Sequence, residues 1–425
     1  MSTQTEPGQQ HWIDRANVVL PAGGFGNFDP GIIIARGKGS HVWDEDGREY
    51  VDLLIGSGPM LIGHDHEEVL DAVREQLDKG LTFFANNAAG IELAEQVRDS
   101  VRCGEKVRYV TSGGEADMYA IRAARAFTGR SKILKFEGGY HGMSAEAQMS
   151  LAPEKLVNFP QAVPDSAGIP QGVRDEMLIA AFNDIEMVRS LLAEHGEEVA
   201  AIIVEPLQRV IPPAPGFLAA LREECDKHGV VLIFDEIVTG YRFAYGGAQE
   251  YYDVTPDLCT LGKIVGGGFP LAAITGRADI MDHFDKAKVG AEGFLMQLGT
   301  LAGNPVAAVA GMKTMEILRR PGQYDKLRAN GQAIWDALTD NLTKHGHAHR
   351  IVGEPYLFDV VFTEQPVNDY RSYIKGDMAK NARFNDMLRE KGIFKAPGKV
   401  YPSLALTEAD LNQISEAIAY AAANL

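Results

Sequence analysis

The chain has 425 residues, of which 45% are hydrophobic, and it carries 41 Lys and Arg against 58 Asp and Glu. A chain of this length is too long to fold around a single hydrophobic core, so we expect two or more subdomains. The formal net charge of −17 argues against partners that are themselves anionic, such as nucleic acid or an acidic membrane surface.

The sequence indicates neither export nor membrane insertion. The N-terminal stretch MSTQTEPGQQ is polar and has neither the basic nor the apolar region of a signal peptide. No apolar run approaches the roughly 20 residues that a membrane span needs. Cys103, Cys225 and Cys259 are widely spaced and form no CxxC pair, which predicts reduced, buried thiols. We therefore expect a cytoplasmic protein.

The N-terminal part predicts a helix followed by a small antiparallel meander. Residues His11–Val19 form the expected helix, and the glycine-rich PAGGFGNF follows as a loop. Alternating segments at Ile32–Ile34, His41–Trp43 and Tyr50–Leu54 predict three short strands. Next, Glu67–Lys79 has the apolar spacing of an amphipathic helix.

From about residue 91 the predicted strands and helices alternate. Strands are expected at Val107–Thr111, Ile133–Phe136, Met177–Ala181, Ala200–Val204 and Val230–Phe234. Helices are expected at Ile91–Val101, between Ser112 and Gly129, at Asp184–His195 and at Phe217–His228. This order favours a doubly wound, mostly parallel sheet. The intervening segment Met143–Glu176 is rich in Pro, Ser and Gly, and we interpret it as an active-site surface loop.

The C-terminal part predicts a second, smaller α+β unit. A helical region from Pro305 to about Arg320 leads into helices at Gly322–Lys344, Asp377–Lys391 and Glu408–Ala423, with strands at Tyr356–Phe362 and within Ile393–Leu406. We divide the chain into an N-terminal segment, 1–60, that packs with the small domain, a large domain, 61–320, and a small C-terminal domain, 321–425.

The strongest chemical signal lies in Val230–Pro270. A buried apolar strand delivers Asp235 at its C-terminal end, the end that faces the ligand crevice of an open α/β sheet. Lys263 follows 28 residues later (263 − 235), flanked by glycines. A desolvated lysine forms a Schiff base with a carbonyl, and an aspartate pairs with a pyridinium nitrogen, so the two suit pyridoxal phosphate. A surface lysine and a helix-capping aspartate are the plainer alternatives.

The stretches FDEIVTGYR and TLGKIVGGGFP resemble the central signature of the class III aminotransferases, in the branch of glutamate-1-semialdehyde aminomutase. The resemblance extends over nearly the whole chain. It implies an α/β protein of fold type I, with a large domain on a mostly parallel, doubly wound sheet and a smaller α+β domain. It also implies that Lys263 holds pyridoxal 5′-phosphate as a Schiff base and then moves a proton, while Asp235 faces the ring nitrogen.

The same resemblance implies where the phosphate binds. Ser112, Gly113 and Gly114 lie between a strand and a helix, where backbone N–H groups form an anion site and glycines allow close approach. An ordinary helix N-cap is the alternative for Ser112. Thr300 matches the position that reaches the phosphate of the neighbouring subunit, so we expect a homodimer with shared active sites.

Five further residues are implied to surround the cofactor ring. Tyr140 stacks on the ring and Ile237 packs beneath it. Glu205 lies near the ring and Gln208 near its phenolic oxygen; a strand-end pair facing water is the alternative for both. His141 stays open between a structural and a site role.

Two histidine groups invite a comparison with metal sites. His64 and His66 form one group, and His345, His347 and His349 the other. Neither has the helical i, i+4 spacing or the cysteine partner that is typical of zinc. We interpret both as solvated turns and expect no metal.

Three substrate-recognition groups of the aminomutases have no counterpart here. The loop GGFGNFDPG lacks their arginine, Ser57 replaces a tryptophan, and APGKVYPSLALTEAD lacks a glutamate. We therefore favour transfer of an amino group from an amino acid or amine to a separate keto or aldehyde acceptor. An intramolecular aminomutase or an epimerase is the alternative on the same fold, and a non-catalytic binding protein is the alternative from another class. Arg209 and Lys399 are candidate anion contacts or plain surface charges.

Overall fold

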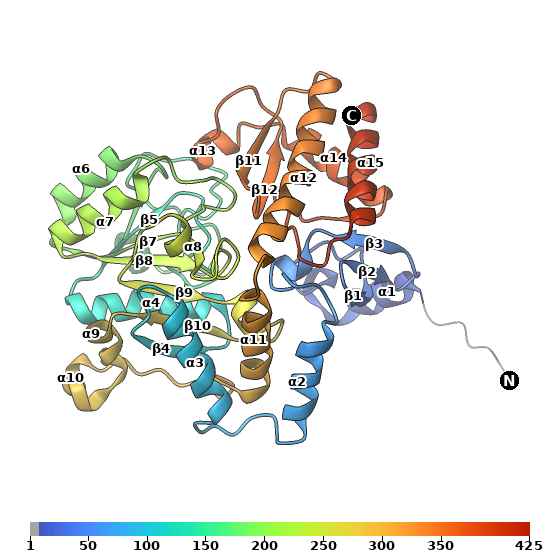
Figure 1. Ribbon diagram of the computed structural model, residues 1–425. Coiled ribbons are helices and arrows are strands. Elements are labelled where there is room, and N and C mark those ends of the chain that lie inside the picture. The colour runs from blue at the N-terminus through green and yellow to red at the C-terminus, as the bar shows by residue number, and fades with distance from the viewer. Residues whose placement is uncertain (1–7) are drawn as a thin grey trace.

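The computed structural model describes residues 8–425, and its central element is a seven-stranded sheet (Figure 1). The strand order is β4-β10-β9-β8-β7-β5-β6. The bounds are β4 Lys106–Val110, β5 Lys132–Phe136, β6 Met177–Ala180, β7 Val199–Val204, β8 Val231–Glu236, β9 Leu258–Leu261 and β10 Ala272–Gly276. Strand β10 runs antiparallel to β4 and β9, and the other pairings are parallel. The prediction of a mostly parallel, doubly wound sheet is confirmed.

Helices cover both faces of this sheet. Helix α4 (Gly113–Thr128) packs on one face, and α3 (Ala88–Ser100), α6 (Ile185–His195) and α7 (Phe217–His228) pack on the other (Figure 1). Successive strand residues point to opposite faces, so Ile202 joins the cluster of α3, α6 and α7 whereas Ile203 joins that of α4. Burial on both faces explains why the strands are continuous apolar runs in the sequence.

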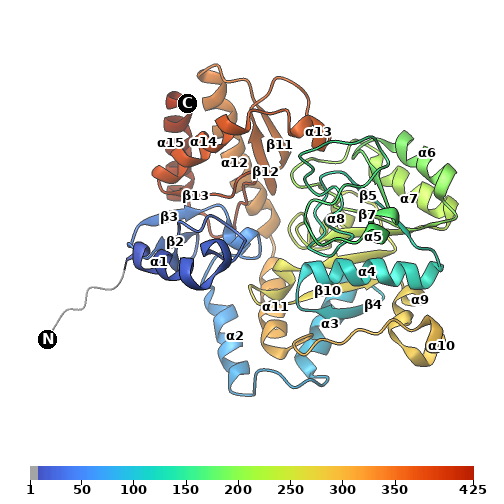
Figure 2. The same cartoon turned by 180° about the vertical axis from the view of Figure 1, so that it is seen from behind.

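The N-terminal part forms the predicted antiparallel meander, and a strand from the C-terminal part completes it. It comprises α1 (Gln9–Val19), β1 (Ile34–Lys38), β2 (His41–Asp44) and β3 (Glu49–Asp52), followed by α2 (Glu67–Leu77). The first strand begins at Ile34, where we expected it to end, because the GKG sequence enters the β1–β2 hairpin and only its last glycine turns the chain. Strand β13 (Ile393–Phe394) pairs in parallel with β3 (Figure 2).

The remaining C-terminal elements form a small body of helices on a two-stranded sheet. They are α12 (Gln323–Lys344), β11 (Arg350–Glu354), β12 (Leu357–Val361), α13 (Tyr370–Tyr373), α14 (Met378–Glu390) and α15 (Glu408–Asn424). Helix α11 (Pro305–Leu318) leads into this body, but its buried side chains join the apolar cluster of the seven-stranded sheet. Helices α12, α14 and α15 pack around a shared apolar cluster. The expected helices and strands are therefore present, and β11 and α13 are additional. The boundaries at residues 60 and 320 stay a prediction.

The segment Met143–Glu176 is not simply a surface loop. It contains one short helix, α5 (Gln171–Asp175), and Met149 is fully buried within it. Lys135 on β5 holds the start of the segment, because its ammonium donates hydrogen bonds at 2.7–3.1 Å to the carbonyl oxygens of Gly139, Ala147 and Met149. A buried lysine, rather than apolar periodicity, thus orders this segment, and the sequence pattern does not reveal it.

Two smaller predictions concern thiols and histidines. The three cysteines are free and buried, as expected. His64 and His347 are less solvated than expected, because His64 Nε2 lies 2.7 Å from Asp52 Oδ2 and His347 Nε2 lies 2.8 Å from the carbonyl oxygen of Ala422, whereas His345 is exposed. Short helices α8 (Gly247–Tyr251), α9 (Ala278–Met281) and α10 (Lys286–Gly293) complete the fold. Within residues 8–425, none of the helices combines the length and hydrophobicity that a membrane crossing requires.

Candidate active site

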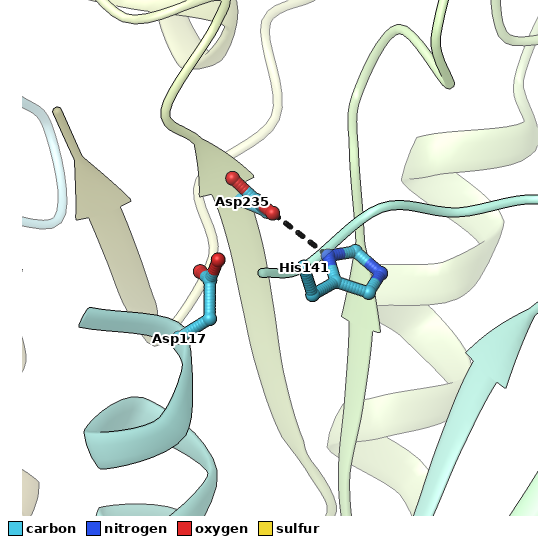
Figure 3. Close-up of side chains that lie close together, drawn as sticks. All are labelled: Asp117, His141 and Asp235. Atoms are coloured by element: carbon cyan, nitrogen blue, oxygen red, sulfur yellow. Dashed lines mark hydrogen bonds and ion pairs between the residues drawn. The ribbon is translucent and has the colours of Figure 1, made fainter. Parts of the chain in front are cut away.

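A buried carboxylate–imidazole pair lies at the carboxyl end of the central strand β8. Asp235 is the penultimate residue of this strand and is 4% exposed, and His141, from the loop after β5, is 1% exposed. Nδ1 of His141 lies 2.7 Å from Oδ2 of Asp235, while the backbone N–H of Ile237 donates to Oδ1 at 3.1 Å (Figure 3). The ambiguity about His141 is therefore reduced, because its ring contacts the predicted site carboxylate directly.

A third buried group, Asp117 on α4, completes this cluster and was not predicted. Potential ligand atoms of Asp117, His141 and Asp235 all lie within 4.8 Å of one another (Figure 3). The Thr260 hydroxyl donates to Asp117 Oδ1 at 2.6 Å. Burial, together with the neighbouring Asp235 charge, raises the pKa of Asp117 well above its ordinary value. A sequence signal did exist, since Asp117 lies four residues before the apolar Ile121 on the buried stripe of α4.

The N-terminus of α4 presents two free backbone amides. The hydroxyl of Ser112 and the carboxylate of Glu115 form a reciprocal capping box, so the N-cap interpretation of Ser112 is correct. Within residues 8–425, no protein acceptor takes the N–H of Gly113 or of Gly114. A Cβ on Gly113 would lie 2.9 Å from Ile237, and one on Gly114 would lie 3.2 Å from the Cα of Gly142. Close packing therefore requires glycines here, and their amides remain available to an anion.

Lys263 occupies a tight turn, η3 (Lys263–Gly266), directly after β9. Its φ of 50° lies in the left-handed region, which is unusual for a residue other than glycine. The side chain is largely buried, and this burial lowers the pKa of the ammonium, an effect that the nearby Tyr401 opposes. A Cβ on the preceding Gly262 would lie 3.0 Å from Ile237. Ile237 therefore lies between the lysine turn and the glycines of α4.

Gly58 packs against three functional side chains. A Cβ at this position would lie 2.8 Å from Nη2 of Arg242, 3.2 Å from Tyr401 and 3.4 Å from Cδ of Lys263. Arg242 is fully buried and bonds the carbonyl oxygens of Gly58 and Val238, whereas its Nη1 has no hydrogen-bond partner within residues 8–425. Neither Arg242 nor Tyr401 was predicted as a site residue, because only the fold brings them to the lysine.

Three of the residues predicted to contact the cofactor ring, Tyr140, Glu205 and Gln208, are held in place by hydrogen bonds. The backbone N–H of Tyr140 donates to Oε2 of Glu205 at 2.9 Å, so these two residues are paired. The side-chain amide of Gln208 donates to the carbonyl oxygen of Glu137 at 2.8 Å, which holds Gln208 against the segment that follows β5. The guanidinium group of Arg209 lies over the Tyr140 ring, and its central carbon is 5.3 Å from the ring centroid.

A cavity of about 270 Å³ opens beside these residues. Its lining includes Gln208 and Arg209 together with Tyr370, Tyr373 and Lys399. Within residues 8–425, neither Arg209 nor Lys399 forms an ion pair with a carboxylate, although the chain is strongly acidic. The cavity wall therefore carries uncompensated positive charge.

Thr300 lies on a different surface. It is exposed in the loop before α11, among the exposed apolar side chains of Met296, Leu298 and Leu301. The nearby Phe84 is 71% exposed, and a cavity of about 580 Å³ separates its loop from the Thr300 loop. Contiguous exposed apolar groups of this kind mark interaction surfaces.

Comparison with known proteins decides the family. The model of the family described as aminotransferase class-III matches residues 26–422, which is nearly the whole chain.

The chain belongs to the class-III aminotransferases.

This aminotransferase is similar to several solved enzymes. An omega-transaminase from Sphaerobacter thermophilus shares 34% identity and a TM-score of 0.91, with 98% of both chains covered. A β-phenylalanine aminotransferase from Variovorax paradoxus shares 30% identity and a TM-score of 0.85, covering 97% of this chain and 93% of that one. A glutamate-1-semialdehyde aminomutase from Pseudomonas aeruginosa PAO1, at 22% identity and a TM-score of 0.87 over 97% and 93%, shares the fold. The predicted family, fold type I and enzyme class are confirmed.

The cofactor of this aminotransferase is pyridoxal 5′-phosphate, and the side chains present fit it. The molecule has a phosphate, an aromatic ring with a basic nitrogen, and an aldehyde. The site offers two free amides at a helix N-terminus, a buried carboxylate near a strand end, and a largely buried lysine.

Substitution of Gly58 by alanine is expected to weaken cofactor binding in this aminotransferase about tenfold or more, because the new Cβ clashes with Arg242 and presses on Tyr401, both of which lie beside Lys263. The φ of 113° adds backbone strain of about 1–3 kcal/mol. Equilibrium dialysis of pyridoxal phosphate measures the effect. Gly47→Ala is the matched control, since Gly47 has a φ of 79° but nothing within 4 Å. Equal losses in both variants would contradict the packing argument.

Proposed function

We propose that this aminotransferase moves an amino group between two separate small molecules, an amino acid or amine donor and a keto or aldehyde acceptor. The observation that carries the proposal is the position of Lys263, whose largely buried amine lies on a tight turn after β9, one strand away from Asp235. We propose Lys263 and Asp235 as the catalytic residues.

The remaining site residues are proposed to hold the cofactor. The amides of Gly113 and Gly114, at the cap formed by Ser112, bind the phosphate. Tyr140 covers one face of the ring and Ile237 the other. His141 and Glu205 lie behind this layer, where they orient Asp235 and Tyr140. Gln208 is proposed near the phenolic oxygen, through its side-chain carbonyl.

Each catalytic residue has a definite task. When bound, pyridoxal phosphate accepts the electrons of a broken C–H bond. The Asp235 carboxylate supplies the negative charge that keeps the ring nitrogen protonated. The Lys263 amine takes the proton from the substrate Cα and later returns it. Because burial lowers the pKa of Lys263, a larger fraction of the amine is neutral near pH 7, and the neutral form is the one that accepts a proton.

Intermolecular transfer and mutase chemistry differ in their need for a second substrate. We expect product formation with a donor alone to stop after one equivalent per site, and to continue only when a keto or aldehyde acceptor is added. Absorbance of the bound cofactor follows the first half-reaction, and product analysis follows the second. Sustained conversion of a single substrate without an acceptor would establish the aminomutase or epimerase alternative.

We propose that the enzyme is a homodimer in which each site receives Thr300 from the other chain. The exposed apolar side chains around Phe84 and Leu298 support an interface at this surface. Sedimentation measures the oligomeric state. If the site is shared, mixing subunits of Lys263→Ala with subunits of Thr300→Val should restore part of the activity that each variant lacks. A monomer, or no complementation, would contradict the shared site.

The positive cavity predicts which donors the enzyme prefers. We expect Arg209→Gln and Lys399→Gln each to raise the KM of donors with a carboxylate about tenfold, the value of one charge-assisted hydrogen bond. The KM of the amine that lacks only the carboxylate should change less than about twofold. Steady-state kinetics with such donor pairs tests this, and the exposed Lys344→Gln is the control. Equal effects on both donors would mean that the two cations do not bind the substrate.

Two coarser features complete the proposal. The division into segments 1–60, 61–320 and 321–425 agrees with the pairing of β3 with β13, which joins the first segment to the last. The cytoplasmic location is proposed from the free, buried thiols, which fit a reducing compartment.

A further inference from the structure

We propose that Asp117 carries a proton and donates a hydrogen bond to the carboxylate of Asp235, which makes Asp117 a positioning residue for the group that faces the cofactor ring nitrogen. The inference rests on the proposed function of Asp235 and goes beyond it, because it assigns a protonation state and a task to a residue on another element.

The surroundings of the two carboxyl groups require one shared proton. Asp117 is 2% exposed and Asp235 4%, so both carboxyl groups are almost completely buried. His141 is the only ion-pair partner of either carboxylate within residues 8–425. Glu205 is a further buried acid close enough to disfavour a charge on Asp117. Two adjacent buried carboxylates with so little compensation do not both ionise at neutral pH.

The hydrogen bonds decide which carboxyl group keeps the proton. Asp235 accepts from two donors, the His141 ring at Oδ2 and the Ile237 backbone N–H at Oδ1, and such donors stabilise the ionised form. Asp117 accepts from one donor, the Thr260 hydroxyl at Oδ1. The second oxygen of Asp117 is therefore free to carry the proton toward Asp235. The raised pKa of Asp117 agrees with this assignment.

The consequence concerns the charge that faces the ring nitrogen. A neutral Asp117 leaves one negative charge, on Asp235, opposite the ring nitrogen. An ionised Asp117 would add a second. The hydrogen bond from Asp117 also fixes the plane of the Asp235 carboxylate, together with His141 and Ile237, so that the group that meets the cofactor is pre-oriented.

Two substitutions of Asp117 in the holoenzyme separate the protonated from the ionised state. Asp117→Asn keeps the size and a donor but removes the ability to ionise, and we expect its dissociation constant for pyridoxal phosphate and its kcat to stay within about threefold of the parent enzyme. Asp117→Leu removes the donor and leaves Thr260 without an acceptor, and we expect cofactor affinity to fall about tenfold or more. Rescue by the asparagine variant is a result that a requirement for the charge would not give.

The outcomes that overturn the proposal are distinct from failure of the proposed function. If Asp117→Asn loses cofactor affinity as strongly as Asp117→Leu, the ionised carboxylate is what matters and the proposal is wrong. If Asp117→Leu retains full affinity, Asp117 does not position Asp235 and the proposal is also wrong. If Asp117→Leu does not fold, the asparagine variant alone decides. Asp235→Asn tests the proposed function on which this inference rests. Unchanged cofactor affinity in that variant would contradict the role of Asp235 itself.

Discussion

Replacement of Lys263 by alanine is expected to reduce amino transfer by about 10⁴-fold, the upper range for loss of a positioned proton-transfer group. The variant also loses the amine that we propose bonds the cofactor aldehyde, so pyridoxal phosphate should be removed by dialysis rather than retained. Turnover is measured with a donor and an acceptor together, and retention is measured from the absorbance of the dialysed protein.

The test of Lys263→Ala has a matched control on a surface helix. Lys326→Ala removes an exposed lysine on α12 and should leave both turnover and retention unchanged. If Lys263→Ala kept its cofactor through dialysis, another amine would be holding the aldehyde. If cofactor were lost while no reaction disappeared, the non-catalytic alternative would gain support.

The second large effect that we expect is a loss of stability on replacement of Arg371, on α13. Its guanidinium forms a two-point pair with the carboxylate of Glu137, at 2.7 and 2.9 Å, and also bonds the carbonyl oxygen of Val157. Glu137 is only 3% exposed, so Arg371→Met would leave a buried charge without a partner. We expect the free energy of unfolding to fall by about 2–4 kcal/mol, somewhat below the range for fully buried pairs because the Arg371 side chain is 29% exposed. Denaturant titration of the apoenzyme measures this.

A double-mutant cycle shows whether the loss comes from the stranded carboxylate. Glu137→Gln alone removes the charge and should cost less than Arg371→Met. The double variant should be more stable than Arg371→Met, because nothing charged remains buried. If the two single effects simply add, the pair contributes no coupling and the interpretation fails. Glu137 directly precedes the loop of Tyr140 and His141, so the cofactor should also bind more weakly to Arg371→Met.

How much of this site the sequence predicts depends on whether the signal is local. Asp235 follows a buried strand and Lys263 lies in a glycine-rich turn, and both patterns are complete within a few residues. Ser112, Gly113 and Gly114 are likewise defined by one strand-to-helix junction. The structure places each of these at the carboxyl edge of the sheet, as such signals predict.

The parts that were missed depend on distant contacts. Asp117 meets Asp235 across 118 residues (235 − 117), and Arg371 meets Glu137 across 234. Neither pairing leaves a periodic trace in the sequence, because one polar residue on an apolar stripe is compatible with many neighbours. Strand β10 was missed for another reason, since Ala272–Gly276 is short and built of small residues, and its identity comes from the neighbouring strands β4 and β9.

The parallel pairing of β3 with β13 has a consequence for biosynthesis. Val51 meets Ile393 across 342 residues (393 − 51), so the edge of the first sheet stays open until almost all of the polypeptide has left the ribosome. The seven-stranded sheet needs nothing beyond β10 and has all its strands much earlier. Nascent chains should therefore acquire protease resistance in the central region first, while the leading strands remain a target for chaperones until translation ends.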